Sequence, residues 1–116
     1  MNKNKILTFN FVCLFLSSFI YSQNLDDLVI DPGFKISIFA KDLLAPRQMV
    51  EGENGTIFVG ERGGQISALI DSDLNGQADL KIIVANDLTY STGISLFKGD
   101  LYFSEISKIW KIENIE

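Results

Sequence analysis

Residues 55–84 read GTIFVGERGGQISALIDSDLNGQADLKIIV and contain three runs typical of β-strands, separated by two different turns. The runs are Thr56–Glu61, Gln65–Ile70 and Leu80–Ala85, the last of which extends one residue beyond the quoted stretch. They alternate in polarity or are rich in β-branched residues, as strands on a pleated surface are. A short turn at Arg62-Gly63-Gly64 joins the first two runs, and a long polar turn at Asp71–Asp79 joins the last two. The pattern predicts antiparallel strands that follow one another in sequence order.

The segment before this stretch contains two further strand candidates. Arg47–Glu51 leads into Asn54-Gly55, a pair that favours a tight reversal because both residues tolerate positive φ. Phe34–Ala40 places Phe34, Ile36, Ile38 and Ala40 on one face, and this alternation predicts a half-buried strand. Residues 23–33 form a lead-in segment that ends in the turn tripeptide Asp31-Pro32-Gly33.

The segment after this stretch repeats the pattern. Strands are expected at Gly93–Phe97, Leu101–Glu105 and Ile109–Glu113, with a turn at residues 98–100. Ile57–Glu61 aligns with Leu101–Glu105 at an offset of about 44 residues, which is the length of one propeller blade. We therefore predict an all-β protein in which residues 34–116 form about two four-stranded antiparallel blades of a β-propeller.

Two blades make an incomplete ring, because propellers close with about four to eight blades. The strand at Ile109–Glu113 would also leave an open sheet edge, which isolated domains normally avoid. We expect the chain to be the N-terminal part of a longer protein.

Residues 1–22 have the three parts of a secretory signal peptide. Lys3 and Lys5 precede the apolar run Ile6–Ile20, and Ser22 is a small residue at a plausible cleavage position. The run is shorter than the roughly 20 apolar residues that cross a bilayer. We expect an exported protein, periplasmic or extracellular, with no membrane association after cleavage. The single cysteine, Cys13, would leave with the signal peptide.

The net charge and the absence of histidine exclude several kinds of binding and catalytic site. The net charge is −5 and the basic residues are scattered, so the chain offers no basic patch for nucleic acid. Histidine is absent, which excludes an imidazole base, an imidazole zinc ligand and a serine–histidine pair within this chain.

The polar turn Asp71–Asp79 carries the strongest chemical signal. Its pattern D-x-D-x-N-G-x-x-D supplies hard oxygen ligands at alternate positions, and Gly76 permits a sharp bend. The candidate calcium ligands are Asp71, Asp73, Asn75 and Asp79. An EF-hand would have a glutamate where Ile82 stands, and helices on both sides, so this is a different kind of loop. The alternative is a solvated turn, which uses the same residue types.

Two other groups of residues are expected to be structural. Glu61-Arg62-Gly63-Gly64 lacks the strand-to-helix context of a phosphate-binding loop, and favours a hairpin turn with a neighbouring ion pair. Tyr102, Phe103 and Trp110 lie within strand periodicity, which favours packing inside a blade over a sugar-binding surface.

Several segments of the chain resemble the glucose/sorbosone dehydrogenase family. The resemblance covers nearly all residues from Asp31 onward and is carried by PGFKISIFA (32–40), NGTIFVGERGG (54–64), the loop Asp71–Asp79 and GDLYFSE (99–105). It implies a six-bladed, exported β-propeller that uses pyrroloquinoline quinone and calcium to oxidise an aldose or a similar sugar.

The same resemblance limits what can be assigned to this chain. The family's catalytic histidine and most of its quinone contacts would lie after residue 116, so no catalytic or quinone-binding residue is assigned here. Where quinoprotein glucose dehydrogenases have Gln-Asn-Gly, this chain reads Ser91-Thr92-Gly93.

Three hypotheses for function follow. The first is the N-terminal portion of an exported quinone-dependent sugar dehydrogenase, inactive alone. The second is a non-catalytic secreted propeller that binds a glycan or a protein through its loops. The third is a calcium-dependent propeller hydrolase of the lactonase type.

Overall fold

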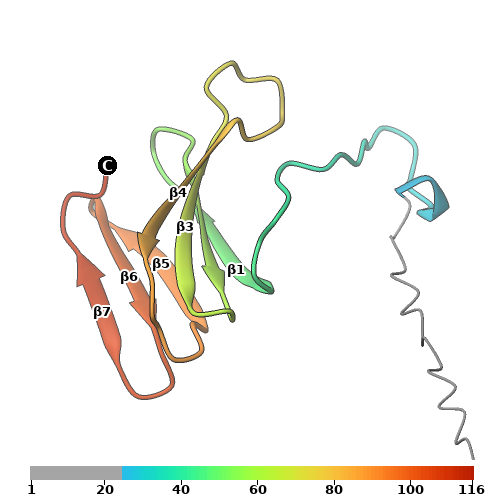
Figure 1. Ribbon diagram of the computed structural model, residues 1–116. Coiled ribbons are helices and arrows are strands. Elements are labelled where there is room, and N and C mark those ends of the chain that lie inside the picture. Colours follow the sequence, from blue (N-terminus) through green and yellow to red (C-terminus); the bar gives the residue numbers. More distant parts are fainter. Residues whose placement is uncertain (1–24) are drawn as a thin grey trace, which may run out of the picture.

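The computed structural model describes residues 25–116, so the predicted signal peptide, residues 1–22, lies outside the described part of the chain. The described part contains a short 3₁₀ turn, η1 (Leu25–Asp27), and seven β-strands (Figure 1). The strands are β1 (Pro46–Glu51), β2 (Ile57–Glu61), β3 (Gln65–Ile70), β4 (Leu80–Ala85), β5 (Gly93–Phe97), β6 (Asp100–Ser104) and β7 (Ile109–Ile112). Within residues 25–116 no helix is long and apolar enough to cross a membrane.

The strands form two separate antiparallel sheets. The first sheet has the order β1-β2-β3-β4 and the second has the order β5-β6-β7. Every hydrogen-bonded neighbour is also the next strand in sequence, so both sheets are simple meanders. The prediction of an all-β protein is confirmed, and the described sheets stay open rather than closing into a ring.

Register assigns each side chain of the first sheet to one of two faces. Phe58 pairs with Ala68 and Gly60 pairs with Ile66, so these residues share the inner face, which packs against the second sheet. Val59 pairs with Ser67 and Glu61 with Gln65 on the outer face. Because side chains alternate along a strand, the polar residues Glu61, Gln65 and Ser67 share the outer face with Ile57, Val59 and Leu69.

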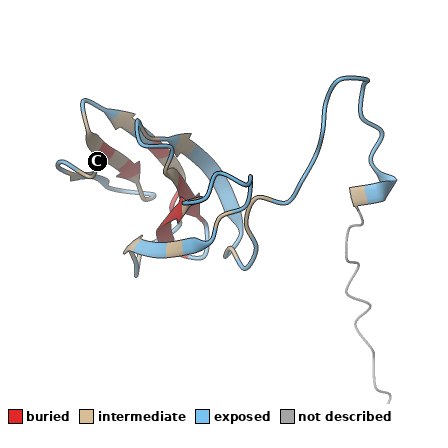
Figure 2. Cartoon of the chain, turned by 90° about the horizontal axis from the view of Figure 1, so that it is seen from above, coloured by how far each residue is buried: buried red, intermediate tan, exposed pale blue. Residues whose placement is uncertain are grey.

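The hydrophobic core lies between the two sheets. Its buried residues are Phe58, Ile66 and Ala68 from the first sheet and Ile94, Leu101 and Phe103 from the second. The sheets contact each other through β1, β2 and β5. Figure 2 shows the buried residues concentrated where the sheets meet, while the long N-terminal segment is exposed.

The predicted strand at Phe34–Ala40 is wrong. The segment is coil, and both Phe34 and Ile36 are exposed. Alternating polarity shows only that a segment is able to line a sheet, whereas a strand also needs a neighbour that exchanges backbone hydrogen bonds. The backbone hydrogen bonds of this segment are a turn bond from the Phe34 N–H to the Asp31 carbonyl, at 3.2 Å, and a bond from the Ala78 N–H to the Phe39 carbonyl, at 2.8 Å. The described sheets therefore begin at Pro46 rather than at Phe34.

The other predicted strands are confirmed with ends that differ by at most one residue. The predicted reversal at Asn54-Gly55 is also present, although only Gly55 takes a positive φ, at +80°. The Gly52 N–H donates to the Thr56 carbonyl at 2.9 Å, which closes the hairpin between β1 and β2.

Candidate functional site

The loop between β3 and β4 brings three predicted calcium ligands together. Carboxylate oxygens of Asp71, Asp73 and Asp79 lie within 4.8 Å of one another. The loop is exposed except for Asp71 and Ala78, which are partly buried. Three carboxylates at this spacing are a suitable start for a calcium site, which takes six to eight oxygen ligands.

The carboxylates also organise the loop itself. Asp71 Oδ2 accepts from the Gly76 N–H at 2.8 Å, and Asp71 Oδ1 accepts from the Asn75 N–H at 3.1 Å. Gly76 has φ +87°, the left-handed conformation that its position in the turn was expected to need. Asp79 Oδ2 accepts from the Ser72 N–H at 3.1 Å. These hydrogen bonds hold the loop without an ion, so calcium binding stays a prediction.

Asn75 plays a different part from the other predicted ligands. Its Oδ1 accepts from the Gln77 N–H at 2.8 Å, and its Nδ2 donates to Asp73 Oδ2 at 3.0 Å. The amide oxygen is thus engaged by the backbone of the loop. The structure brings together three of the four predicted ligands, whereas the Asn75 side chain forms hydrogen bonds within the turn.

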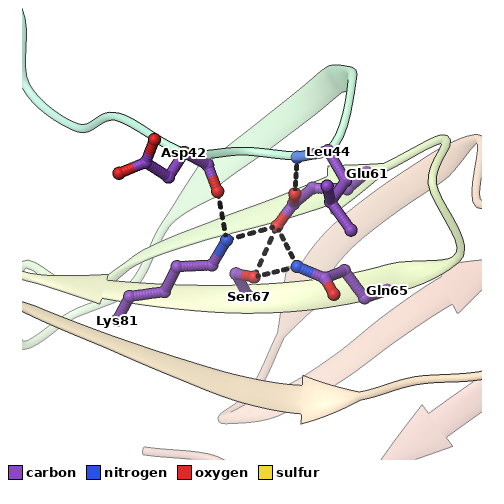
Figure 3. Close-up of polar contacts among 6 residues, drawn as sticks. All are labelled: Asp42, Leu44, Glu61, Gln65, Ser67 and Lys81. Carbon is purple, nitrogen blue, oxygen red and sulfur yellow. Dashed lines mark hydrogen bonds and ion pairs between the residues drawn. The ribbon is translucent and has the colours of Figure 1, made fainter.

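A second polar cluster, which the sequence did not predict, surrounds Glu61 on the outer face of the first sheet (Figure 3). Glu61 is the last residue of β2 and has no exposed surface. Its Oε2 accepts a hydrogen bond from the Leu44 N–H, and its Oε1 accepts from Gln65 Nε2 at 3.0 Å and from the Ser67 hydroxyl. We call these residues, together with Lys81, the Glu61 cluster.

Lys81 completes the Glu61 cluster from β4. Its Nζ lies 3.5 Å from Glu61 Oε1 and donates to the Asp42 carbonyl at 2.9 Å. The segment that contains Asp42 and Leu44 is thereby attached to the outer face by two independent bonds (Figure 3). A charged carboxylate that leaves water is costly unless it is paired and hydrogen-bonded, and this one is both.

The balance of these effects sets the protonation of Glu61. Burial raises its pKa, but the hydrogen bonds from Gln65, Ser67 and the Leu44 N–H, together with the charge of Lys81, bring the pKa below its ordinary value. An ionised carboxylate whose oxygens are already engaged by the protein is a poor proton acceptor. The Glu61 cluster is therefore a structural clasp rather than a catalytic base.

The hairpin turn predicted at Glu61–Gly64 is present, with an ion pair beside it. Glu61 pairs with Lys81, while Arg62 Nη2 donates to the Tyr90 hydroxyl. The Arg62 guanidinium also lies over the Tyr90 ring, 4.6 Å from its centroid. Glu61 is the last residue of β2 and Arg62 is the first residue of the turn, so the two side chains have different partners.

Glu105 occupies the corresponding position after β6. Its Oε2 accepts from the Thr89 N–H at 2.6 Å, and its Oε1 accepts from the Trp110 indole Nε1 at 2.6 Å. These hydrogen bonds, first from Thr89 and then from Trp110, lower the pKa of Glu105. In both sheets a glutamate at the end of the second strand, Glu61 as its last residue and Glu105 directly after it, thus binds the backbone of the segment that precedes the first strand. The alignment of Ile57–Glu61 with Leu101–Glu105 was the sequence signal that pointed to this pair.

Residues 91–93 hold the start of β5 against the end of β6. The Thr92 N–H donates to the Ser104 carbonyl at 3.0 Å, and the Gly93 N–H donates to Ser104 Oγ at 3.0 Å. An open depression of about 280 Å³ beside them is lined by Gln48, Gly93, Ile94, Ser95, Tyr102, Phe103, Ser104 and Ile109.

These residues do not fit pyrroloquinoline quinone. The quinone carries carboxylates, which proteins bind with arginine or lysine, and neither residue lines this depression. The calcium ion that the resemblance associates with the quinone would also need several oxygen ligands, and the described Asp71–Asp79 loop is a separate element on the β3–β4 connection.

Two further predictions concern aromatic residues. Phe103 is buried in the core, and Tyr102 is partly buried, as expected for residues that pack within a sheet. Trp110 departs from the prediction because 43% of its surface is exposed.

Comparisons with protein-family models, with curated proteins and with solved structures found no match to this chain.

Proposed function

We propose that this chain supplies consecutive blades of an exported β-propeller of the glucose/sorbosone dehydrogenase type, and that it does not oxidise a sugar by itself. The observation that carries the proposal is the repeated glutamate contact. Glu61 binds a backbone N–H that lies 17 residues earlier, and Glu105 binds one that lies 16 residues earlier. Two unrelated hairpins would have no reason to share this long-range bond, whereas two copies of one repeat unit would.

The order and placement of the sheets support the same proposal. Each sheet is a meander, and β1 and β5, the first strands of the two sheets, contact each other. In a propeller the first strand of each blade lies nearest the central axis, so first strands of successive blades are neighbours. The second sheet matches the first three strands of such a blade.

The outer faces of the two sheets carry exposed apolar surface that suits contact with further blades. On the first sheet, Met49 and Ile57 line an apolar depression of about 390 Å³, which coil residues between Ile38 and Leu43 also line. On the second sheet, Phe97 and Ile109 are exposed on the face that points away from the core, with Ile109 80% exposed. Repeat folds bury such faces by stacking one unit on the next, so these surfaces suit contact with additional blades.

The proposed lack of activity rests on residue chemistry. Oxidation of a sugar hydroxyl needs a base that removes its proton, and this chain has no histidine. Glu61 and Glu105, the strongest carboxylate candidates, are both held ionised by hydrogen bonds that their structural partners donate. The chain accordingly acts as part of the scaffold around a sugar site.

Enzyme assays test this proposal. The purified full chain is incubated with pyrroloquinoline quinone, calcium and a panel of aldoses, and reduction of an electron-accepting dye is followed. We expect the rate to equal that of the free quinone. Turnover that depends on the chain would contradict the proposal.

The coding DNA after the codon for Glu116 provides the sharper test. Further repeats of about 44 residues that carry a histidine and basic residues are expected. Repeats with acidic metal ligands and no such histidine would instead favour the calcium-dependent hydrolase. A coding region without further repeats would contradict both.

A further inference from the structure

A cleft of about 440 Å³ opens between the end of β4 and the turn that joins β6 to β7. The connection that follows β4 runs toward the lower end of the sheets in Figure 1, where the turn between β6 and β7 also lies. Phe103 and Ala85 contribute apolar surface from the two sheets, and Asn86, Asp87, Glu105 and Lys108 contribute polar groups. Ligand pockets commonly combine an apolar floor with a few fixed polar groups in this way.

Trp110 forms one wall of the cleft and is held in a fixed orientation. It pairs with Phe103 across β6 and β7, so its ring stands on the face of the second sheet that points toward β4. Its indole Nε1 donates to Glu105 Oε1 at 2.6 Å, and the other oxygen of Glu105 is held by the Thr89 N–H. An exposed aromatic ring without such constraints would be an ordinary surface residue. This ring is presented to the cleft by a carboxylate that is itself anchored.

The charges around Trp110 select the class of ligand. Lys108 Nζ lies 5.4 Å from the Trp110 ring centroid, which is the position that a cationic ligand would need for a cation–π contact. Asp87 and Glu105 carry negative charge on the same cleft, which disfavours an anionic ligand. The site therefore suits a neutral molecule with an apolar surface for the indole and hydroxyl groups for the amide, carboxylate and ammonium groups.

We propose that this cleft binds a neutral pyranose unit of a carbohydrate. The C–H face of the sugar packs on the part of the Trp110 ring that Lys108 leaves uncovered, and its hydroxyls bond to Asn86, Asp87 and Lys108. The proposal does not depend on membership of a sugar dehydrogenase family, because the cleft lies away from the depression beside β1 and β5.

Trp110 provides its own test, since it is the only tryptophan in the chain. The full chain is titrated with the methyl pyranosides of glucose, galactose, mannose and xylose while tryptophan fluorescence is recorded. We expect at least one neutral pyranoside to change the emission saturably. D-glucuronate should bind at least about tenfold more weakly, because its carboxylate meets the negative charges of Asp87 and Glu105. Equal binding of D-glucuronate would overturn the proposed selectivity.

Two variants locate the site. Asn86→Ala and Lys108→Met should each weaken binding about tenfold, because each removes a hydrogen-bonding group and leaves the indole in place. Lys98→Met is the matched control, since Lys98 lies over the Phe97 ring at 5.2 Å but outside the cleft. It should leave binding unchanged.

The proposal is overturned if no neutral pyranoside gives a saturable change, or if Lys98→Met weakens binding as much as Lys108→Met does. Thermal melting of each variant, compared with that of the natural chain, separates loss of binding from loss of folding. Isothermal titration calorimetry with Trp110→Phe extends the test to a variant that has no fluorophore, and binding there at unchanged affinity would also overturn the proposal.

Discussion

Glu61 and Glu105 occupy equivalent positions in the two sheets but have different surroundings. Each follows or ends the second strand of its sheet, and each accepts a hydrogen bond from the loop before the first strand. Glu61 has no exposed surface, since Leu44 and Lys81 cover it, whereas Glu105 lines an open cleft. A glutamate at the end of the second strand therefore makes a buried structural contact in the first sheet and borders a cleft in the second.

The difference arises from what lies over each glutamate. The segment before β1 crosses the outer face of the first sheet and is attached there by Asp42 and Leu44. Glu105 instead points toward the first sheet, close to the end of β4, where the cleft separates the two sheets. Glu61 and Glu105 thus make the same kind of backbone contact but differ in what covers them, and four experiments test how far this distinction holds.

Removing each carboxylate in a separate variant should give the largest difference in the free energy of unfolding. Glu61→Ala should lower the free energy of unfolding by about 2–4 kcal/mol, because Lys81 Nζ and the Leu44 N–H lose a buried acceptor. Glu105→Ala should have a clearly smaller effect, since its partners border the cleft and can bond to water. Urea denaturation of the full chain measures both values.

Glu61→Gln is the control for side-chain volume and should fall between the natural chain and Glu61→Ala. If the two alanine variants were equally destabilised, the distinction between a buried clasp and an open rim would be wrong.

The turn after β2 should show the next largest effect. Gly64 has φ +97° and a Cβ there would lie 2.7 Å from the Leu88 carbonyl oxygen. Gly64→Ala should cost about 1–2 kcal/mol for the left-handed backbone and about 1 kcal/mol or more for the contact. Gly76→Ala is the matched control, because Gly76 has φ +87° and open space at the Cβ position.

Both glycine variants can be compared by thermal melting of the full chain. Equal losses of stability would mean that the close approach of Leu88 contributes nothing, and that the turn of the first sheet does not support the connection to the second.

Calcium should stabilise the first sheet by a smaller amount. With a dissociation constant on the order of 1 mM, about 10 mM calcium should add about 1.4 kcal/mol of stability and raise the melting temperature by several degrees. Asp73→Asn should abolish the increase because it removes one of the three clustered carboxylates. Magnesium at the same concentration serves as the control for ionic strength, and an equal increase with magnesium or in Asp73→Asn would refute a calcium site.

Acidification should change the free energy of unfolding by the smallest amount of the four experiments. It tests the separate contributions of Glu61 and Glu105. The pKa of Glu61 in the folded chain is below its ordinary value of 4.5, so its ionised form stabilises folding above that pH. The contribution is lost as the pH falls from 4.5 through the folded-state pKa. Stability should therefore decline below pH 4.5, and Glu61→Gln should make the decline shallower.

Denaturant titrations at several pH values between 3 and 6 measure this slope. Glu105→Gln is the comparison, since the pKa of Glu105 is lowered as well. A slope that neither substitution changes would show that other carboxylates, such as Asp100, account for the acid sensitivity.

Most strands were predictable because their evidence is local. Gln65–Ile70 and Leu80–Ala85 were predicted with the ends that β3 and β4 have, since polarity, β-branching and flanking turn residues all agree there. Phe34–Ala40 failed although its alternation is the most regular of all. Alternation cannot reveal whether a partner strand lies alongside, and none does within residues 25–116.

The two polar sites also differ in whether the sequence predicted them. Asp71, Asp73 and Asp79 were found from spacing, because a tight turn brings nearby residues together. The Glu61 cluster was missed, since it joins Leu44, Glu61 and Lys81 across three elements of the fold. Side chains so far apart in the chain meet only after the strands have paired in register.

The amino-acid sequence by itself determined the order of strands and turns, the all-β class and the spacing that aligns Glu61 with Glu105, because these depend on local conformational preference and on spacing. Only the tertiary structure decided which glutamate is covered, where Trp110 is exposed and which side chains border the cleft. Those properties depend on how two sheets and one coil segment lie against each other, and that placement rests on contacts between residues distant in the chain.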